Sequence, residues 1–259
     1  MHDFAFSTIS ARLIDAIRIN KTVEVQQGDK SFLLKQRYTG RGWVIRCGNV
    51  FLRLSNSKII MFPNARVWQD WEIHSFTLLY HAACSPVNHN AILCEKLPGT
   101  SLRRLLAHGL LNANMMQAAG REFARAHALY SSTIGGLWSH GDPHLDNVLY
   151  DAESDGVFLI DFETRHWPTL ADVHRHADDL LVFLLDLLGR DKTEHWKRLC
   201  QTFLACYDRK ESVRALAGRL KMPHGLELIL WKTRTDNCST QQLRIRLREL
   251  CEVVGAFGE

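Results

Sequence analysis

The chain has 259 residues, of which 46% are hydrophobic and 23% charged, and its formal net charge is +4. This is an ordinary globular composition, and the length suffices for one large domain or for two lobes that each bury a core. The small basic excess permits an anionic ligand without demanding nucleic acid, so no nucleic-acid partner is expected.

The cysteines and the apolar segments favour a cytoplasmic chain with no transmembrane segment. The number of cysteines is odd and no CxxC pair occurs, so neither a disulfide framework nor a zinc site is expected. The longest strongly apolar run, Leu180–Leu188, is far shorter than the ~20 residues that span a bilayer. The N-terminus does not resemble a secretory signal.

Helix and strand patterns alternate in the N-terminal third. Apolar residues at helical spacing predict a helix over residues 7–19. Alternating polar and apolar residues over 22–38, with a turn at Gln27–Asp29, predict a β-hairpin. A one-sided apolar pattern predicts a helix over residues 65–83.

Residues 40–62 permit two interpretations. They could form strands with turns at Gly48–Asn49 and Asn56–Ser57, or the segment "GNVFLRLS" could form a short helix. The pattern alone does not decide between them.

The rest of the chain is rich in helices and contains one hairpin. Residues 91–95 read as a strand before a Pro98–Gly99 turn, and residues 148–150 and 157–160 read as a hairpin. Helices are expected over 101–108, 112–130, 172–188, 193–207 and most of 210–256. The fold class is therefore α+β, with a strand-containing N-terminal lobe (1–97) and a larger helical C-terminal lobe (98–259).

Polar groups flank the predicted hairpin at one end. Asn147 immediately precedes the first strand, and Asp161 immediately follows the second. Antiparallel pairing would bring these two residues side by side, and their hard oxygens suit Mg²⁺. Asp142 lies shortly before Asn147 on a loop that Pro143 keeps out of a helix, where its carboxylate could face a substrate hydroxyl.

This spacing matches phosphoryl transfer on the kinase plan. There, a loop Asp orients or deprotonates the acceptor hydroxyl, while an Asn on that loop and a later Asp hold Mg²⁺ on the nucleotide phosphates. In "HGDPHLDNVLYD" and "LIDFE", the offset from Asp142 to Asn147 equals the kinase offset, and Asp161 stands where the later Asp is expected. ATP and Mg²⁺ are the cofactors that this pattern predicts.

The loop resembles that of the protein-kinase-like superfamily, nearest the aminoglycoside/choline phosphotransferase-like kinases and the lipopolysaccharide-core sugar kinases. "LCEKLPGTSLRRLL", "AAGREFARAHAL" and "HRHADDLLVFLLDLL" resemble, in order, their hinge, the helix before the catalytic loop and a later supporting helix. The resemblance implies a bilobal fold that transfers the γ-phosphate of ATP to a hydroxyl of a small molecule or sugar-type acceptor. It also implies that Asp179, with Asp178 close behind, supports the loop.

On the nucleotide side, the resemblance requires a strand Lys paired with a helical Glu. Lys35 and Glu72 are the candidates, with Lys58 and Arg53 as rivals for the basic residue and an edge-strand lysine as the alternative for Lys35. An insertion must then separate the strand from the helix. Further expectations are that backbone from Glu95 to Leu97 binds adenine and that His144 contacts the γ-phosphate.

Several features depart from protein kinases. The chain has no GxGxxG loop, carries DFE where DFG is usual, and has no APE motif. These departures disfavour a phosphorylation-switched protein kinase, and they leave two alternatives: a simple bacterial Ser/Thr kinase and a catalytically weak pseudokinase scaffold.

The remaining polar residues near the loop receive structural interpretations. His140 is expected to support the loop, His174 and His176 to lie on a helix surface, and the acids of the turns to be solvated. These acids are Asp146, Asp151 and Asp155. The basic face of residues 243–250 is expected to be solvated, although it would also allow contact with an anionic substrate or peripheral contact with a membrane.

Overall fold

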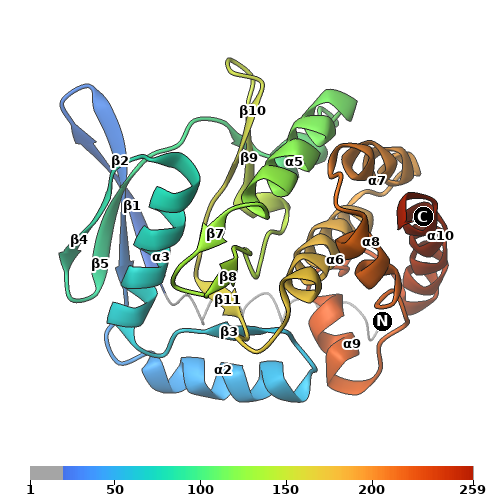
Figure 1. Cartoon of the computed structure of the whole chain (residues 1–259), viewed down its shortest axis with the longest axis horizontal. Coiled ribbons are helices and arrows are strands. Elements are labelled where there is room, and N and C mark those ends of the chain that lie inside the picture. The colour runs from blue at the N-terminus through green and yellow to red at the C-terminus, as the bar shows by residue number, and fades with distance from the viewer. Residues whose placement is uncertain (1–19, 259) are drawn as a thin grey trace. The chain divides into compact units, whose positions relative to one another are not determined.

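The computed structural model describes residues 20–258. By its internal contacts the chain divides into two compact units. The first contains the described residues up to Arg53 together with Met61–Lys96, and the second contains Leu54–Ile60 together with the residues from Leu97 onward. The α+β class, with its antiparallel N-terminal sheet and larger helical part, is confirmed (Figure 1). The assignment of lobes to 1–97 and 98–259 remains a prediction.

The first unit is built on a four-stranded antiparallel sheet in the order β1-β2-β5-β4. Its strands are β1 (Asn20–Gln27), β2 (Lys30–Arg37), β4 (Cys84–Asn88) and β5 (Ala91–Glu95). The predicted hairpin is β1–β2, and it turns at Gly28, whose φ of +62° suits a residue without Cβ. Since β1 and β5 flank it on both sides, β2 is a central strand.

The undecided segment 40–62 is mostly helical. Helix α2 (Gly42–Leu54) is followed by the short strand β3 (Ile59–Met61), so the strand interpretation is wrong up to Leu54. Gly48 and Asn49 lie within α2, so no turn forms there, and the Asn49 side chain binds the backbone of Met61. Its Nδ2 donates to Met61 O over 2.8 Å and its Oδ1 accepts from Met61 N over 2.8 Å. The alternative, a short helix over "GNVFLRLS", is correct in kind, but the helix begins earlier, at Gly42.

Helix α3 (Ala65–Tyr80) forms as predicted and is tied to the sheet. Asn64 caps its start by accepting the Arg66 amide over 2.8 Å. Gln69 Nε2 donates to the carbonyls of Asn88 over 2.6 Å and Ala91 over 2.9 Å. The helix therefore has a fixed position on β4 and β5.

One disulfide corrects the expectation drawn from the cysteines. Cys84 on β4 and Cys94 on β5 are cross-strand partners with Cα atoms 4.0 Å apart, and their sulfurs are bonded. The seven cysteines of the chain do not form a framework of bridges, but this pair removes the cysteine-based reason to expect a reducing compartment.

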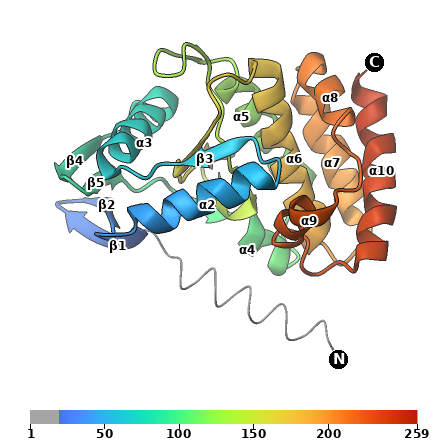
Figure 2. The same ribbon diagram turned by 90° about the horizontal axis from the view of Figure 1, so that it is seen from below.

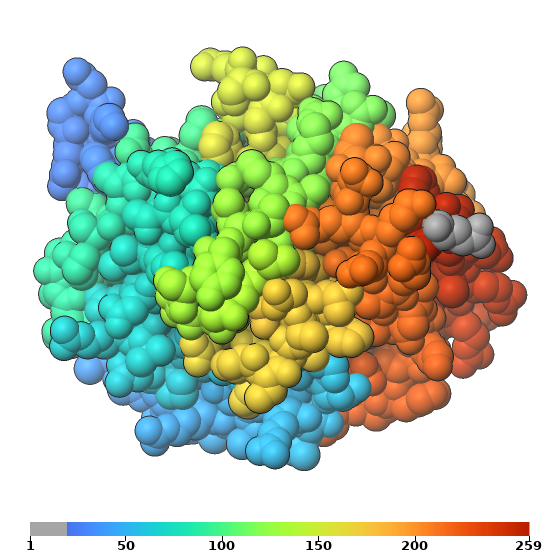
Figure 3. All heavy atoms as spheres, viewed as in Figure 1, coloured from blue at the N-terminus to red at the C-terminus, as the bar shows by residue number. Residues whose placement is uncertain are grey.

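The second unit is mainly helical. Its helices are α4 (Leu102–Ala107), α5 (Ala113–Ala126), α6 (Asp172–Arg190), α7 (His195–Cys206), α8 (Lys210–Ala217), α9 (Gly225–Lys232) and α10 (Thr240–Gly258). Its strands are β6 (Thr100–Ser101), β7 (Tyr130–Ser131), β8 (Gly136–Leu137), β9 (Val148–Asp151), β10 (Gly156–Leu159) and β11 (Thr164–His166). The predicted hairpin is β9–β10, and β6 pairs with its open edge. In the space-filling view the turn of this hairpin projects from the surface (Figure 3).

The core of this unit lies among α5, α6 and α7. Phe123, Phe183 and Phe203, one from each helix, are fully buried, and each pair of their rings has centroids between 4.7 and 5.2 Å apart. Such aromatic contacts stabilise beyond the burial of area alone. This cluster holds α6 in place, and α6 in turn carries the carboxylates described below.

Two further expectations concern the ends of the chain and the membrane. The helix predicted over residues 7–19 lies outside the described residues. Over the part that is described, none of the helices combines the length and the apolar character needed to span a bilayer.

Two helical glycines should respond oppositely to replacement by alanine. A Cβ at Gly120 on α5 would collide with the Phe203 carbonyl oxygen on α7, whereas a Cβ at Gly255 on α10 meets no described atom within 4 Å. We expect Gly120→Ala to lower the free energy of unfolding by about 1–3 kcal/mol through overpacking. Gly255→Ala should raise it by up to about 1 kcal/mol through helix propensity. Urea unfolding measures both, and equal effects would contradict the packing described for α5 on α7.

Candidate active site

The loop from Ser139 to Asn147 is held on α6 by one buried carboxylate. Asp179 has no solvent exposure, and its two oxygens accept the amides of His140 over 2.8 Å and Gly141 over 2.7 Å. Gly141 has a φ of +92°, and a Cβ there would lie 2.8 Å from Thr164 Oγ1, so the loop requires glycine. The expectation that Asp179 supports the loop is confirmed.

A second carboxylate of α6 holds the far end of the loop. Asp186 Oδ2 accepts the Leu145 amide over 3.0 Å, while its Oδ1 accepts from Arg190 Nε over 2.7 Å. Asp186 stands two helical turns after Asp179 and therefore faces the same side of α6. Asp186 received no role in the sequence analysis, although its spacing of seven residues from Asp179 was the available signal.

Buried histidines surround Asp179. His127 Nε2 lies 3.1 Å from Asp179 Oδ2, and His127 Nδ1 lies 2.7 Å from the Tyr207 hydroxyl. His176 stacks on His127 at 4.0 Å and binds the Trp138 carbonyl through Nε2 over 3.0 Å. The prediction of a surface position is wrong for His176, because its contact to Trp138, the residue before the loop, draws it into the interior; His174 is exposed as predicted.

Burial and charge shift the titration of this cluster. Burial acts to raise the pKa of Asp179, but the neighbouring His166 and His127 outweigh it and hold that pKa well below its usual range. Burial lowers the pKa of His127, His140 and His176. The folded protein therefore favours an ionised Asp179 and neutral imidazoles at His127, His140 and His176.

His140 braces the loop, as expected. Its Nε2 donates to the Ile160 carbonyl over 2.9 Å, and its Nδ1 accepts the Asp142 amide over 3.2 Å. The fully buried Phe162 packs its ring 5.2 Å from His140 and 5.7 Å from Trp138. The segment around Asp161 is thereby fixed to the loop around Asp142.

Asn147 and Asp161 lie at adjoining chain segments, at one end of the β9–β10 hairpin. The Ile160 amide donates to the Asn147 carbonyl over 2.9 Å, which continues the ladder one step past Val148 and Leu159. Asn147 Nδ2 donates to the Asp142 carbonyl over 2.9 Å, so its amide oxygen is turned away from that carbonyl. Asp161 has a φ of +70°, a conformation rare outside glycine that suggests functional constraint.

The donor set here fits Mg²⁺. An amide oxygen and a carboxylate are hard ligands, and Mg²⁺ commonly takes only one or two protein oxygens together with phosphates and water. Within residues 20–258, no group of three or more His, Cys, Asp and Glu side chains is arranged to hold a metal. Asn147 and Asp161 supply one amide oxygen and one carboxylate of this kind.

Asp142 has a partner that sequence reasoning missed. Arg234, just beyond α9, places Nη2 2.5 Å from Asp142 Oδ1, and both side chains are largely covered, with 18% and 27% exposed. Burial acts to raise the pKa of Asp142, but Arg234 and then His144 lower it below its usual range. No local pattern marks Arg234, since only the tertiary fold brings residues so far apart in sequence together.

The turn acids near the site are at least partly exposed, and each has a partner in the chain. Asp146 forms an ion pair with Arg103 at 2.5 Å, and both side chains stay exposed to solvent, as predicted for Asp146. Asp151 accepts from Ser154 Oγ over 2.6 Å and Asp155 from the Tyr150 hydroxyl over 2.7 Å, which closes the hairpin turn. These two acids serve the turn, as predicted.

The predicted basic face of residues 243–250 is partly turned inward. Arg246 donates to the carbonyls of Leu188 and, over 2.6 Å, Asp191. This arginine thus ties α10 to the end of α6, and it is not a solvated or ligand-facing charge.

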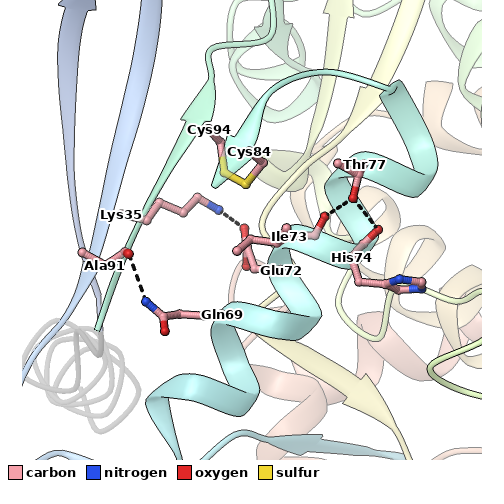
Figure 4. The surroundings of a disulfide bond; sticks show 9 residues. All are labelled: Lys35, Gln69, Glu72, Ile73, His74, Thr77, Cys84, Ala91 and Cys94. Atoms are coloured by element: carbon pink, nitrogen blue, oxygen red, sulfur yellow. Dashed lines mark hydrogen bonds and ion pairs between the residues drawn. A yellow bond between two sulfur atoms is a disulfide. The ribbon is translucent and has the colours of Figure 1, made fainter. Parts of the chain in front are cut away.

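Lys35 and Glu72 form an ion pair in the first unit. Lys35 on β2 points at Glu72 on α3, and their side chains are 12% and 1% exposed (Figure 4). Lys35 is not on an edge strand, because β2 is central. Its rivals lie elsewhere: Lys58 is bound to Asn56 over 2.8 Å, and Arg53 is exposed in the last turn of α2. The expected insertion between strand and helix consists of α2 and β3.

The other proposed nucleotide contacts lie at element ends. Glu95 ends β5, where its amide donates to the Ala83 carbonyl over 2.7 Å and its carboxylate accepts from Lys30 over 3.0 Å. Leu97 follows two residues later. His144 caps the short 3₁₀ helix Leu145–Asn147 through Nδ1, which accepts the Asp146 amide over 3.3 Å.

Comparison with protein-family models and with curated proteins finds no match for this sequence. Among solved structures, the chain is similar to a spectinomycin phosphotransferase in complex with ADP and spectinomycin, at 12% identity over 95% of this chain and 98% of that one, with a TM-score of 0.41. It is also similar to an ethanolamine kinase from Plasmodium vivax (10% identity, 92% and 79% covered, TM-score 0.49). A third similar structure is an ADP-bound aminoglycoside phosphotransferase, at 12% identity over 97% of this chain and 98% of that one, with a TM-score of 0.41. These likenesses are distant, so the chemistry proposed below rests on the chain's own side chains.

The histidine cluster should make stability fall in mild acid. In the unfolded chain the histidines gain protons below their ordinary pKa of about 6.5, whereas burial keeps them neutral in the folded chain. The unfolded state then binds more protons. We expect the free energy of unfolding to fall below about pH 6.5 by up to about 1.4 kcal/mol per pH unit for each of His127, His140 and His176.

Urea titrations across this pH range measure the slope. His176→Gln should make the slope of the free energy of unfolding against pH shallower by up to about 1.4 kcal/mol per pH unit. The same change at the exposed His174 should leave the slope unaltered. A flat profile in the parent protein would contradict the cluster of neutral buried imidazoles.

Proposed function

We propose that the protein is an ATP- and Mg²⁺-dependent phosphotransferase that moves the γ-phosphate to a hydroxyl group of a small molecule or a sugar- or lipopolysaccharide-type acceptor. The observation that carries this proposal is the braced loop. The Asn147 side chain donates a hydrogen bond to the Asp142 backbone carbonyl. Asp161 follows β10, the strand that pairs with the one after Asn147. These are the three groups, in the required order, that phosphoryl transfer needs.

Asp142 is assigned to the acceptor. Arg234 occupies Asp142 Oδ1, which leaves Oδ2 as the oxygen that would accept a hydrogen bond from the acceptor hydroxyl. The lowered pKa keeps this carboxylate ionised, so it can align the hydroxyl and take its proton as the new phosphate ester forms. Arg234 acts through Asp142 and is a positioning residue.

Asn147 and Asp161 are assigned to the metal. When bound, Mg²⁺ offsets negative charge on the nucleotide phosphates. The Asn147 side chain is oriented for this role by its donation to the Asp142 carbonyl, and the conformation of Asp161 is stabilised by the burial of Phe162 next to it.

Each nucleotide contact is assigned from the surroundings of the residue itself. Lys35, held by the buried Glu72, would bind the α- and β-phosphates. The Glu95 carbonyl and the Leu97 amide would bind adenine, because the Glu95 amide is already engaged by Ala83. His144 would reach the γ-phosphate through Nε2, since Nδ1 accepts the Asp146 amide.

Substitution of the two key acids should separate binding from transfer. Asp142→Asn removes the negative oxygen that aligns and deprotonates the acceptor, so we expect the rate of phosphoryl transfer to fall by about 10²–10⁴-fold. ATP hydrolysis, in which water is the acceptor, measures this rate. ATP with Mg²⁺ should still raise the melting temperature of this variant. Asp161→Asn removes a metal ligand and should abolish the Mg²⁺-dependent part of that shift.

Asp151→Asn is the matched control, because Asp151 serves only the hairpin turn, and both readouts should stay at the parent level. Unimpaired turnover by the Asp142 and Asp161 variants would refute the assignment. A parent protein with neither a melting shift nor ATP hydrolysis would favour a scaffold in place of an enzyme.

Removing Arg234 should move the pH dependence of the reaction. Arg234 lowers the pKa of Asp142, so in Arg234→Gln this carboxylate protonates at higher pH. The acid limb of the kcat/KM profile for ATP turnover should therefore shift upward in pH. A double variant with Asp142→Asn should lose nothing beyond the Asp142 change alone, since Arg234 acts through that residue. A lower rate with an unmoved acid limb would mean that Arg234 serves only the fold.

A further inference from the structure

The outward face of α2 is apolar along its whole length. Trp43, Val50 and Leu54 are 68%, 60% and 68% exposed, and Cys47 between them is also exposed. Their spacing of four, three and four residues sets all four on one line of the helix. The opposite side carries Ile45 and Leu52, which are buried. A surface helix ordinarily turns a polar side to water, so the apolar outward face of α2 calls for a partner.

The helix is held so that this face stays outward. Asn49 binds both backbone groups of Met61, and Gly48 lies against the Met61 side chain, which fixes the inner side of α2 on the end of β3. Figure 2 shows α2 as the long blue helix. Turning the apolar line inward would break both Asn49 hydrogen bonds and expose Ile45.

The charge of the helix is of one sign. Its sequence, GWVIRCGNVFLRL, contains no acidic residue, and Arg46 and Arg53, two turns apart, lie on the same flank of the apolar line and are both exposed. Arg41 precedes the helix and lies over the ring of Tyr38, which is 45% exposed. Aromatic rings and arginines beside an apolar stripe are the composition of helices that lie in a membrane interface.

We propose that the outer face of α2 docks on an anionic membrane surface. Trp43, Val50 and Leu54 would enter the boundary between headgroups and acyl chains, while Arg46 and Arg53 would bind phosphate groups beside them. A second copy of the chain suits this face less well. A symmetric contact would bring the same arginines together with no acid on α2 to pair with them.

The test uses the full chain and sedimentation with vesicles of phosphatidylcholine, alone or mixed with phosphatidylglycerol. The parent protein should sediment with the mixed vesicles, less with neutral ones, and less at high salt. A variant carrying Trp43→Ser, Val50→Ser and Leu54→Ser should lose partitioning by roughly tenfold or more. Arg46→Gln with Arg53→Gln should reduce only the preference for the anionic vesicles.

The matched control replaces three apolar residues that are as exposed but lie on other elements. Val87→Ser, Leu110→Ser and Tyr130→Ser, at 54%, 58% and 65% exposure, should leave vesicle binding unchanged. Because all six positions are exposed, both triple variants should keep the melting temperature of the parent. A variant that melts lower is replaced by its three single substitutions, whose losses of binding should add up.

A second readout reports on the face itself. Cys47 and Cys251 are both exposed free cysteines, and only Cys47 lies on the apolar line. A polarity-sensitive fluorophore on Cys47, with Cys206 and Cys251 replaced by Ser, should shift to the blue on mixed vesicles; the same probe on Cys251, with Cys47 and Cys206 replaced, should not. Absence of vesicle binding, an unshifted Cys47 probe, or concentration-dependent dimers that the triple variant abolishes would overturn the proposal. None of these outcomes depends on phosphotransfer.

Discussion

Two consecutive backbone amides bound to one buried carboxylate determine the geometry of the candidate site. Charge-assisted hydrogen bonds of this kind contribute about 1.5–3 kcal/mol each, and the alternative for Asp179 is an unpaired buried charge, which costs more. The loop after Trp138 therefore has one acceptable path across α6. Asp142 is the next residue of this loop, and the Asn147 side-chain amide donates to its carbonyl. The contact of His140 with Phe162 connects the loop to the neighbouring Asp161. A disturbance anywhere in this chain of contacts would reach Asp142 and Asp161.

The parts of the site that the sequence predicted are those whose geometry follows from short-range pattern. Antiparallel pairing alone brings the segment of Asn147 next to that of Asp161, because each residue flanks a strand of the same hairpin. Lys35 and Glu72 were identifiable for a related reason. A lysine amid apolar residues of a strand and a glutamate on an aromatic helix are each locally marked, even though α2 and β3 intervene.

The parts that were missed depend on tertiary packing. Arg234 meets Asp142 only because the segment after α9 folds back onto the loop, and no spacing rule connects the two. His176 looked like half of a surface pair, but the Trp138 carbonyl and the stacked His127 draw it inward. Residues 42–54 contain β-branched and aromatic residues typical of strands. The helix forms because Ile45 and Leu52 find a surface to bury against, and because Asn49 binds Met61 in place of making a turn.

The way α3 is mounted bears on how such an enzyme would be controlled. In protein kinases, activity is switched by moving the helix that carries the Glu into and out of reach of the Lys. Here Gln69, one turn before Glu72, is hydrogen-bonded to the carbonyls of Asn88 and Ala91, so the helix could swing only by breaking both hydrogen bonds to the sheet. The Lys35–Glu72 contact is thus assembled in advance. Turnover in a protein built this way would depend on the concentrations of nucleotide and acceptor. The position of α3 would stay fixed and would not switch the activity.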